Sequence, residues 1–173
     1  MGWKRSFSYL KHRLLRISDS SHSVALGLAL GFGVSFTPLL GTHFIQAGLL
    51  AYALRCNAFA AIVGTFIGNP WTFPLFWWSG FSFGSFLFSV FGFKGAEKIP
   101  DKFEIAQLWD IITTQPMALF LPWMLGGYIL FILSVPAAYY VYYKLISAAK
   151  KARTKAADLR KKQKLKKLED AAE

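Results

Sequence analysis

The middle of this sequence contains almost no charge. Between Val24 and Phe93 the only Asp, Glu, Lys, Arg or His residues are His43 and Arg55, although 17% of the whole chain is charged. A water-soluble domain of this size needs polar helix faces or polar alternation along its strands, and this stretch has neither. We therefore predict an all-α polytopic integral membrane protein, with the lipid bilayer as its solvent.

Cysteine is nearly absent, and histidine is sparse. The single cysteine, Cys56, excludes a disulfide within the chain, and His12, His22 and His43 lack the spacing of metal ligands. The apolar region also contains no pair of carboxylates, no glycine-rich phosphate loop and no nucleophile elbow. We expect no metal, no cofactor and no enzymatic activity.

Positive charge gathers at the two ends, and the net charge of the chain is +11. Residues 1–22 have apolar side chains at helical spacing among Lys and Arg, which predicts a basic amphipathic helix at the membrane interface; a soluble packing helix is the alternative. Residues 144–173 predict a basic helical tail. Because basic flanks mark the cytoplasmic side, we expect both termini there, which requires an even number of crossings.

The basic ends also indicate partners. Anionic lipid headgroups attract basic side chains near the membrane surface by about 1 kcal/mol each, while a solvated helix end that only fixes orientation is the alternative for the tail. A second copy of the chain is a further candidate partner, and specific nucleic-acid binding is not expected. A cleaved signal peptide is the competing interpretation of the start, but no A-x-A-like site closes the apolar run, so we expect the start to be retained.

The apolar sequence of the membrane domain, residues 23–143, is interrupted by helix breakers. Its first run, residues 24–36, is followed by Pro38 and Gly41 before the chain resumes as residues 43–54. The first run would rise only about 20 Å as a helix, which is short of a hydrocarbon core of about 30 Å. We predict two half-helices that meet at a break and return to the same side; one kinked crossing is the alternative.

The second run repeats this design. Residues 58–68 end at Asn69 and Pro70, and after Pro74 the chain resumes as residues 75–93. Corresponding short segments that proline interrupts are a sequence pointer to a transporter-like binding site. The sequence therefore predicts two broken or re-entrant helical elements.

The last third of the chain is simpler. A polar loop is predicted at residues 94–115, outside the membrane, and it includes a short interfacial helix. Residues 117–143 are apolar and long enough to span a membrane with tilt, with kinks expected at Pro122 and Pro136. We predict a C-terminal transmembrane helix there, anchored at the cytoplasmic face by its last tyrosines.

Three pairs of glycines lie four residues apart. Small residues at this spacing flatten one helix face and let the backbones of membrane helices approach each other. The pairs are Gly27 with Gly31, Gly64 with Gly68, and Gly80 with Gly84.

Polar side chains near the two breaks are the candidate substrate-binding residues. Each of them either satisfies backbone groups that the breaks free, or faces a cavity where helix N-termini attract an anion. Arg55 is either part of a short cytoplasmic turn or a fixed cation for an anionic substrate. The candidates are Arg55, Asn57, Asn69, Thr72, Thr42, His43 and Gln46.

A series of short motifs in this region also occurs in one known family. The motifs are Ala-x-Gly-x-Ala-x-Gly at 25–31, Pro-x-x-Gly at 38–41, Asn57, Gly-Thr at 64–65 and Asn-Pro-x-Thr at 69–72. Through them, residues 22–95 resemble the bacterial inner-membrane family catalogued as domain of unknown function 2062, with a departure at His43, where a Gln often lies. The resemblance implies an inner-membrane location, and relatives that look fused to glycosyltransferase-like domains imply a link to envelope polysaccharide.

Two functions are consistent with these observations. The first is a transporter or scramblase-like protein that moves or binds an anionic envelope solute or lipid-linked phosphate, with Arg55 and the two breaks forming one site. The alternative is a non-catalytic membrane scaffold that anchors an envelope-polysaccharide enzyme through its basic tail.

Overall fold

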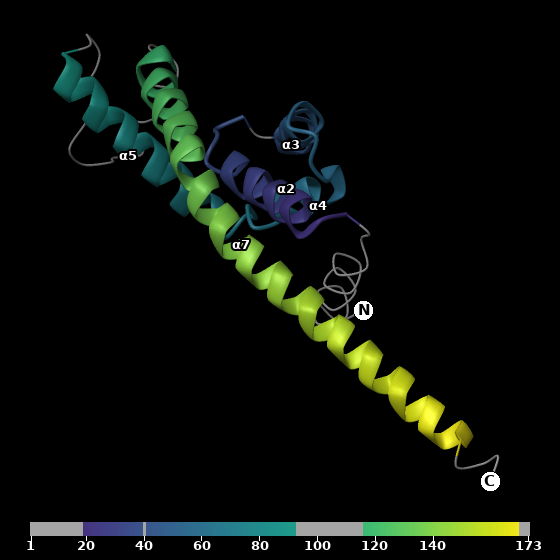
Figure 1. Ribbon diagram of the computed structural model, residues 1–173. Helices are drawn as coiled ribbons and strands as arrows, with labels where there is room; N and C mark the ends of the chain where they lie inside the picture. Colours follow the sequence, from purple (N-terminus) through teal and green to yellow (C-terminus); the bar gives the residue numbers. More distant parts are fainter. Residues whose placement is uncertain (1–18, 40, 93–115, 170–173) are drawn as a thin grey trace.

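The computed structural model describes residues 19–39, 41–92 and 116–169, and these parts of the chain contain helices and no strand (Figure 1). The all-α prediction is confirmed for these residues. The amphipathic helix predicted at 1–22 lies almost wholly outside the described residues, and the polar segment at 94–115 lies entirely outside them. The helices are α2 (Ser21–Val34), α3 (His43–Ala53), α4 (Ala58–Thr65), α5 (Phe73–Phe91) and α7 (Pro116–Glu169).

The first three of these helices form a compact unit. His43 at the start of α3 donates a hydrogen bond from Nε2 to the carbonyl of Thr37, just beyond the end of α2, at 3.1 Å. After α3, the backbone amide of Asn57 donates to the carbonyl of Ser23 at the start of α2, at 3.3 Å. α3 therefore runs back along α2 as the predicted hairpin, and α4 starts beside the start of α2 and runs parallel to it.

Side chains cap the starts of α2 and α4. The Ser20 hydroxyl accepts from the amide of Ser23 at 3.1 Å, and Oδ1 of Asn57 accepts from the amide of Ala60 at 2.6 Å. Each bond satisfies one of the amides that have no partner in the first turn of a helix. Asn57, a candidate binding residue, thus uses its side-chain oxygen to start α4.

α2 and α4 touch through their glycines. A Cβ atom on Gly31 would clash with the carbonyl oxygen of Ala61, and a Cβ atom on Gly64 would clash with the carbonyl oxygen of Leu28. Gly27 likewise faces the backbone at the start of α4. Small residues allow this approach of backbone to backbone, which is how helices pack where lipid offers no hydrophobic contrast.

The other glycines of the predicted pairs lie in different surroundings. Gly80 and Gly84 on α5 face α7, where a Cβ atom on Gly84 would clash with the carbonyl oxygen of Pro122. Gly68 lies beyond the end of α4, in the second break. Gly64 and Gly68 therefore do not form a pair on one helix face, because α4 ends between them.

α7 is the longest described helix, and both α2 and α5 pack against it. Gly33 near the end of α2 faces Phe131, and Lys150 donates to the carbonyl of Asp19 before the start of α2, so α2 and α7 are antiparallel. α5 continues past the end of α2 and crosses the first turns of α7 (Figure 1). α2 and α5 thus follow one another along α7, while α3 and α4 pack on α2 and on each other.

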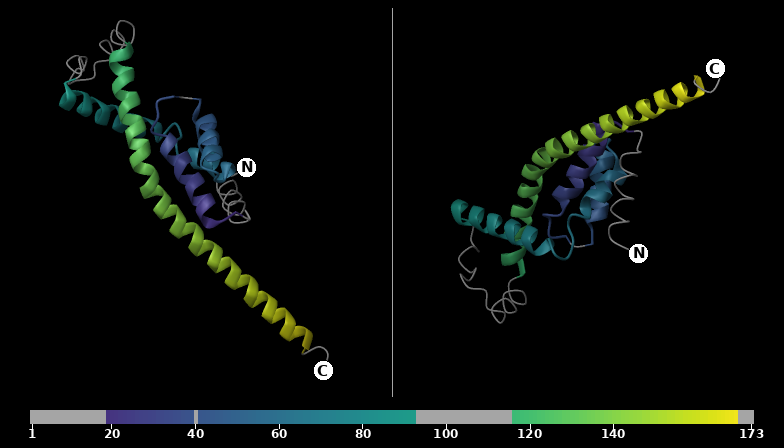
Figure 2. Two further views of the ribbon diagram at one scale, coloured as in Figure 1. Left: turned by 45° about the horizontal axis from the view of Figure 1, so that its top comes forward. Right: turned by 90° about the horizontal axis from the view of Figure 1, so that it is seen from below.

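α7 is one continuous helix of 54 residues. Pro122 and Pro136 lie within it without ending it, and Figure 2 shows the helix curving in its green part, where both prolines lie. Each proline removes one backbone hydrogen bond and so favours a bend. The apolar part and the basic tail, which the sequence divides at residues 143 and 144, share this one helix.

The described helices expose much of their apolar surface. The buried core consists mostly of small side chains on α2, α3 and α4, whereas large ones such as Leu49, Trp78 and Ile132 are more than 60% exposed. By length and composition, α7 includes a stretch within Leu119–Gln163 that is apolar enough to cross a membrane; among the other described helices, the apolar α2 is shorter than a span. Extended apolar surface marks contact with a membrane or with another protein.

We expect Gly31→Ala and Gly64→Ala to lower the free energy of unfolding by about 1–3 kcal/mol, because the added methyl group forces α2 and α4 apart. Gly48→Ala on α3 is the matched control, since a Cβ atom there meets nothing within 4 Å. It should raise stability by up to about 1 kcal/mol through helix propensity. Thermal unfolding of the full chain in one detergent checks this prediction, and a similar loss in all three variants would contradict it.

Candidate binding site at the two helix breaks

The two breaks lie side by side, because the parallel helices α2 and α4 end at the same level. Gly68 in the second break approaches the Ser35 side chain in the first. His43 and Phe73 begin α3 and α5, and their rings stack at a centroid distance of 5.3 Å with an interplanar angle of 23°. Polar residues of two separate sequence segments are therefore neighbours in the fold.

Most polar side chains of the first break form hydrogen bonds to its own backbone carbonyls. The hydroxyls of Thr37 and Thr42 each donate to the carbonyl three residues earlier, both at 2.8 Å. Pro38 starts the turn and Gly41 has a φ of +82°, a conformation that residues with a side chain rarely adopt. His43 is only 7% exposed, and its Nε2 bonds to the break itself.

The second break is a closed hydrogen-bonded turn. Oδ1 of Asn69 accepts from the amides of Trp71 at 3.0 Å and Thr72 at 3.2 Å. The Thr72 hydroxyl donates to the carbonyl of Ile67 at 2.6 Å and accepts from the amide of Asn69 at 3.0 Å. With Pro70 inside this turn, the Asn-Pro-x-Thr motif connects the end of α4 to the start of α5, and both polar side chains are used in doing so.

Pro74 does not break a helix, as the sequence predicted for it together with Pro70. It lies in the first turn of α5. Amides in the first turn have no partner within the helix, so a proline there loses no hydrogen bond and its fixed φ suits the helix. Pro74 therefore starts α5.

A pocket of about 350 Å³ lies beside the first break, between α2, α3 and α7. Nε2 of Gln46 donates to the Thr42 hydroxyl at 2.7 Å, and the Tyr128 hydroxyl donates to Oε1 of Gln46 at 3.3 Å. Gln46 thus bridges the break and α7, while the surface of the pocket itself is almost wholly apolar. The lining residues are Val34, Thr37, Gln46, Leu49, Leu50, Ala53, Tyr128 and Phe131.

Arg55 lies at the other end of α3, about 18 Å from His43 by helical rise. Its φ is +49°, and the amides of Arg55 and Cys56 donate back to the carbonyls of Tyr52 and Ala51. This is the hydrogen-bond pattern of a Schellman cap, a position that usually holds glycine. The Arg55 side chain is exposed, and it has no hydrogen-bond or ion-pair partner in the part of the chain that the structure describes.

Asn57 belongs to the same end of the unit as Arg55. Its Nδ2 donates to Oδ2 of Asp19 at 2.6 Å, and the Lys150 ammonium donates to the backbone carbonyl of Asp19. Cys56, between Arg55 and Asn57, is partly buried, and burial raises the pKa of its thiol. The starts of α2 and α4 are thus tied to α7 by one polar cluster.

The candidate binding residues therefore divide into two groups, one at each end of α3. Those of the breaks, Thr42, His43, Gln46, Asn69 and Thr72, are brought together. Arg55 and Asn57 are not joined to them, so the single site expected from Arg55 and both breaks does not form. The parallel course of α2 and α4 causes this division, because it brings the breaks to one end and the α3–α4 turn to the other.

The structure adds three residues to these groups that the sequence did not predict: Tyr128, Asp19 and Lys150. Tyr128 is one of many aromatic residues in an apolar helix, and nothing local indicates that it meets Gln46. Asp19 is the only acidic residue before α2, and Lys150 lies in the basic tail. Their opposite charges are the one signal that could have suggested that they are neighbours.

Residues 4–155 match the model of a protein family whose description is "Uncharacterized protein conserved in bacteria (DUF2062)". The match includes both breaks, the pocket and most of the described helices, and it extends well beyond the resemblance at residues 22–95. No curated protein and no solved structure matches the chain.

We expect Asn69→Ala to lower the free energy of unfolding by about 1–2 kcal/mol, because two backbone amides lose their acceptor. Asn69→Asp keeps an oxygen in the same place and should lose less than half as much. The measurement is thermal unfolding of the full chain in detergent. An unchanged midpoint for Asn69→Ala would show that the side chain is not needed to close the turn.

Proposed function

The chain belongs to the bacterial family described as DUF2062, and from that premise we propose that it is a polytopic inner-membrane protein that binds and moves an anionic lipid. The observation that carries this proposal is the course of the pocket between α2, α3 and α7. The pocket begins at the polar groups of the first break and reaches Ala53, two residues before Arg55. The proposed activity is binding and movement, without catalysis.

The proposed membrane arrangement has two crossings. The apolar part of α7, residues 116–143, is about 42 Å long, which is enough to cross a core of about 30 Å with tilt. α4 and α5 make the second crossing, which the Asn-Pro-x-Thr turn interrupts, and α2 with α3 makes a hairpin that enters and leaves on one side. Both ends of the chain then lie on the cytoplasmic side, in agreement with the basic flanks.

The polar cluster at the start of α2 supports this arrangement. Asp19 precedes α2, Asn57 precedes α4, and Lys150 lies where the tail leaves the unit, and hydrogen bonds join these three residues. Such groups are stable at the water-facing boundary of a membrane, where a lysine keeps its ammonium in the interface. The exposed apolar side chains of α5 and of the first part of α7 lie toward the other end, where lipid covers them at no cost.

The shape of the pocket suits a hydrocarbon chain. On α3 it is lined by Gln46, Leu49, Leu50 and Ala53, which share one helix face. A chain that lies along this face extends from the first break to the turn at Arg55. Leu49 is 63% exposed, so the wall is open at the side and a lipid can enter from the bilayer.

Arg55 offers a partner for the phosphate of such a lipid. Its guanidinium is exposed, and planar guanidinium groups bind phosphate oxygens through two hydrogen bonds. The pocket wall is almost wholly apolar, so it takes the hydrocarbon part of the lipid. A headgroup that moves along the pocket from Arg55 has to exchange its contacts with those that Gln46 makes to Thr42 and Tyr128 at the other end.

We expect Arg55→Gly to weaken the binding of a polyprenyl phosphate by about fivefold, because one basic residue near the surface contributes roughly 1 kcal/mol. Glycine is the replacement of choice, since it keeps the left-handed cap of α3. Binding is measured by titrating the full chain in detergent with the lipid and following intrinsic tryptophan fluorescence.

Arg55→Lys is the matched control for charge and should retain at least half of the affinity. The same proteins in vesicles then report the movement of a labelled polyprenyl phosphate or phospholipid between leaflets. The proposal fails if wild type and Arg55→Gly alike neither bind nor move these lipids.

A scaffold function is the second candidate, and the basic part of α7 favours it. From Lys151 to Gln163 every side chain is exposed, and this part of the helix projects beyond the rest of the molecule (Figure 1). A long exposed helix with six basic residues and one acidic residue over this range fits an anionic surface, either lipid headgroups or an acidic partner protein.

Removal of residues 151–173 separates the two candidates and leaves the Lys150 contact with Asp19 in place. A transporter should keep at least half of its lipid affinity without the tail and show the fivefold weakening with Arg55→Gly. A scaffold should show the reverse in the envelope phenotype of a strain that lacks the protein: the truncated chain fails to complement and Arg55→Gly complements. Complementation of that strain, with membrane levels of each variant checked by immunoblot, is the measurement.

A further inference from the structure

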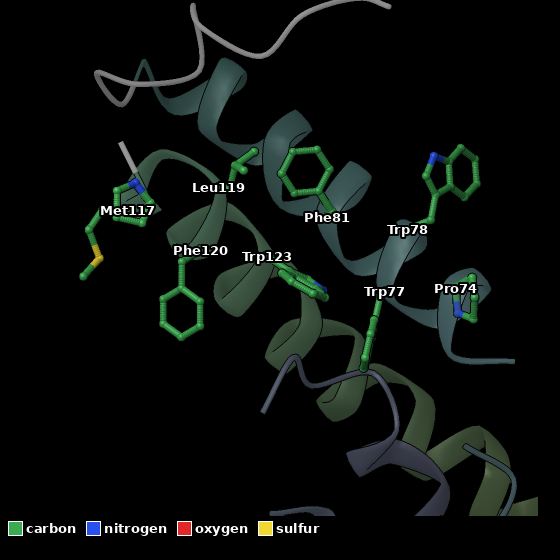
Figure 3. A pocket seen from close by; sticks show the side chains of 9 residues that line it. Pro74, Trp77, Trp78, Phe81, Met117, Leu119, Phe120 and Trp123 are labelled. Atoms are coloured by element: carbon green, nitrogen blue, oxygen red, sulfur yellow. The ribbon is translucent and has the colours of Figure 1, made fainter. Parts of the chain in front are cut away.

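We propose that the cleft between α5 and the first turns of α7 binds one diacyl membrane lipid through its ester carbonyls, at a site separate from the pocket beside the first break. The cleft has a volume of about 530 Å³, and Figure 3 shows aromatic side chains of both helices along it. Trp77, Trp78 and Phe81 come from α5, and Phe120 and Trp123 come from α7. Such walls suit hydrocarbon chains.

Two hydrogen-bond donors in the cleft lining have no acceptor. Nε1 of Trp77 and Nε1 of Trp123 are buried and form no hydrogen bond, and among the described residues only the hydroxyl of Ser85 shares this condition. Buried donors are nearly always paired, because an unpaired one loses its hydration without compensation. Two orphan donors in one cleft therefore indicate a ligand that supplies acceptors.

The contact between the two indoles does not satisfy them. Their rings meet edge to face, with centroids 5.3 Å apart and an interplanar angle of 73°. An N–H group that points at a ring gains less than one that points at an oxygen. Each ring lines the cleft while its nitrogen is covered, so the proposed hydrogen bonds require a change in a side-chain torsion that brings each N–H to the surface of the cleft.

The chemistry of the lining selects the ligand. An indole donates and does not accept, so the ligand must bring acceptor oxygens, and no charged side chain lines the cleft in the described part of the chain. Among the described residues, a free phosphate group would find no cation there. A diacyl glycerolipid has two ester carbonyls for the two donors and two hydrocarbon chains for the apolar walls.

The depth of the cleft agrees with ester groups, and this step rests on the membrane arrangement proposed above. The tyrosines Tyr139, Tyr140 and Tyr143 and the cation of Lys144 mark one boundary of the hydrocarbon core on α7. A helix crosses a core of about 30 Å in roughly 20 residues along the membrane normal, and in a few more when it is tilted. Counting back along α7 brings the other boundary, where lipid esters lie, to the first turns of α7, which carry Phe120 and Trp123.

The test is a competition between an ester lipid and its ether analogue. The full chain is purified in detergent with equal amounts of dioleoyl phosphatidylcholine and the dialkyl-ether lipid of the same chains and headgroup, and retained lipid is counted by native mass spectrometry. We expect a preference for the ester lipid of roughly tenfold, which corresponds to two hydrogen bonds of ordinary net strength. Trp77→Phe with Trp123→Phe should abolish this preference.

Two variants serve as controls. Trp78→Phe changes a lining tryptophan whose nitrogen is not among the buried unpaired groups, and it should keep the preference. Arg55→Gly should also keep it, which separates this site from the phosphate site. Equal retention of ester and ether lipid by wild type, or a preference that survives in the double variant, overturns the proposal. Displacement of the ester lipid by equimolar polyprenyl phosphate or isoprenoid quinone would identify another occupant and overturn it as well.

Circular dichroism and the midpoint of thermal unfolding show whether the double variant is folded. Phenylalanine retains an aromatic ring at both positions, so the double variant should fold, and without an unpaired donor its midpoint should equal or exceed that of lipid-depleted wild type. A midpoint well below that of lipid-depleted wild type would mean that the indole nitrogens are needed within the protein itself, which contradicts the proposal.

Discussion

The contact of α2 with α4 through glycine is the interaction on which the arrangement of this chain depends. Gly27, Gly31 and Gly64 bring two backbones so close that no side chain fits between them. Because the two helices are parallel, the chain between them must return, and α3 makes that return. The same geometry brings both helix breaks to one end of the unit and the turn at Arg55 to the other.

The two breaks are possible because side chains within them form hydrogen bonds to the backbone groups that the breaks leave without a helical partner. Thr37 and Thr42 serve the first break, and Asn69 and Thr72 serve the second, through hydrogen bonds to carbonyls and amides that a continuous helix would have paired. Unpaired backbone is costly in an apolar environment, so polar residues in these positions are structural first. The chemistry left for a ligand belongs to other groups, chiefly the exposed guanidinium of Arg55.

α7 relates the two proposed lipid sites to each other. Its middle carries Tyr128, which bonds to Gln46 beside the pocket, and its first turns carry Trp123, which meets Trp77 in the cleft. The pocket ends near the cation of Arg55, whereas the cleft offers buried donors and, among the described residues, no charged side chain. The two sites therefore favour different parts of a lipid, the phosphate at one and the ester carbonyls at the other.

Local features of this protein could be predicted from its sequence alone. The all-helical class followed from composition, and the breaks followed from Pro38, Gly41 and Pro70, because the limits that proline and glycine place on the backbone act within a few residues. What the tertiary structure decided concerns which helix faces meet: the parallel course of α2 and α4, the bond of Tyr128 to Gln46, and the separation of Arg55 from the breaks. α2 is apolar on nearly every side, so its hydrophobic pattern does not distinguish one face from another. Only the fit of glycine against backbone selects the face that packs, and that fit exists once both helices are in place.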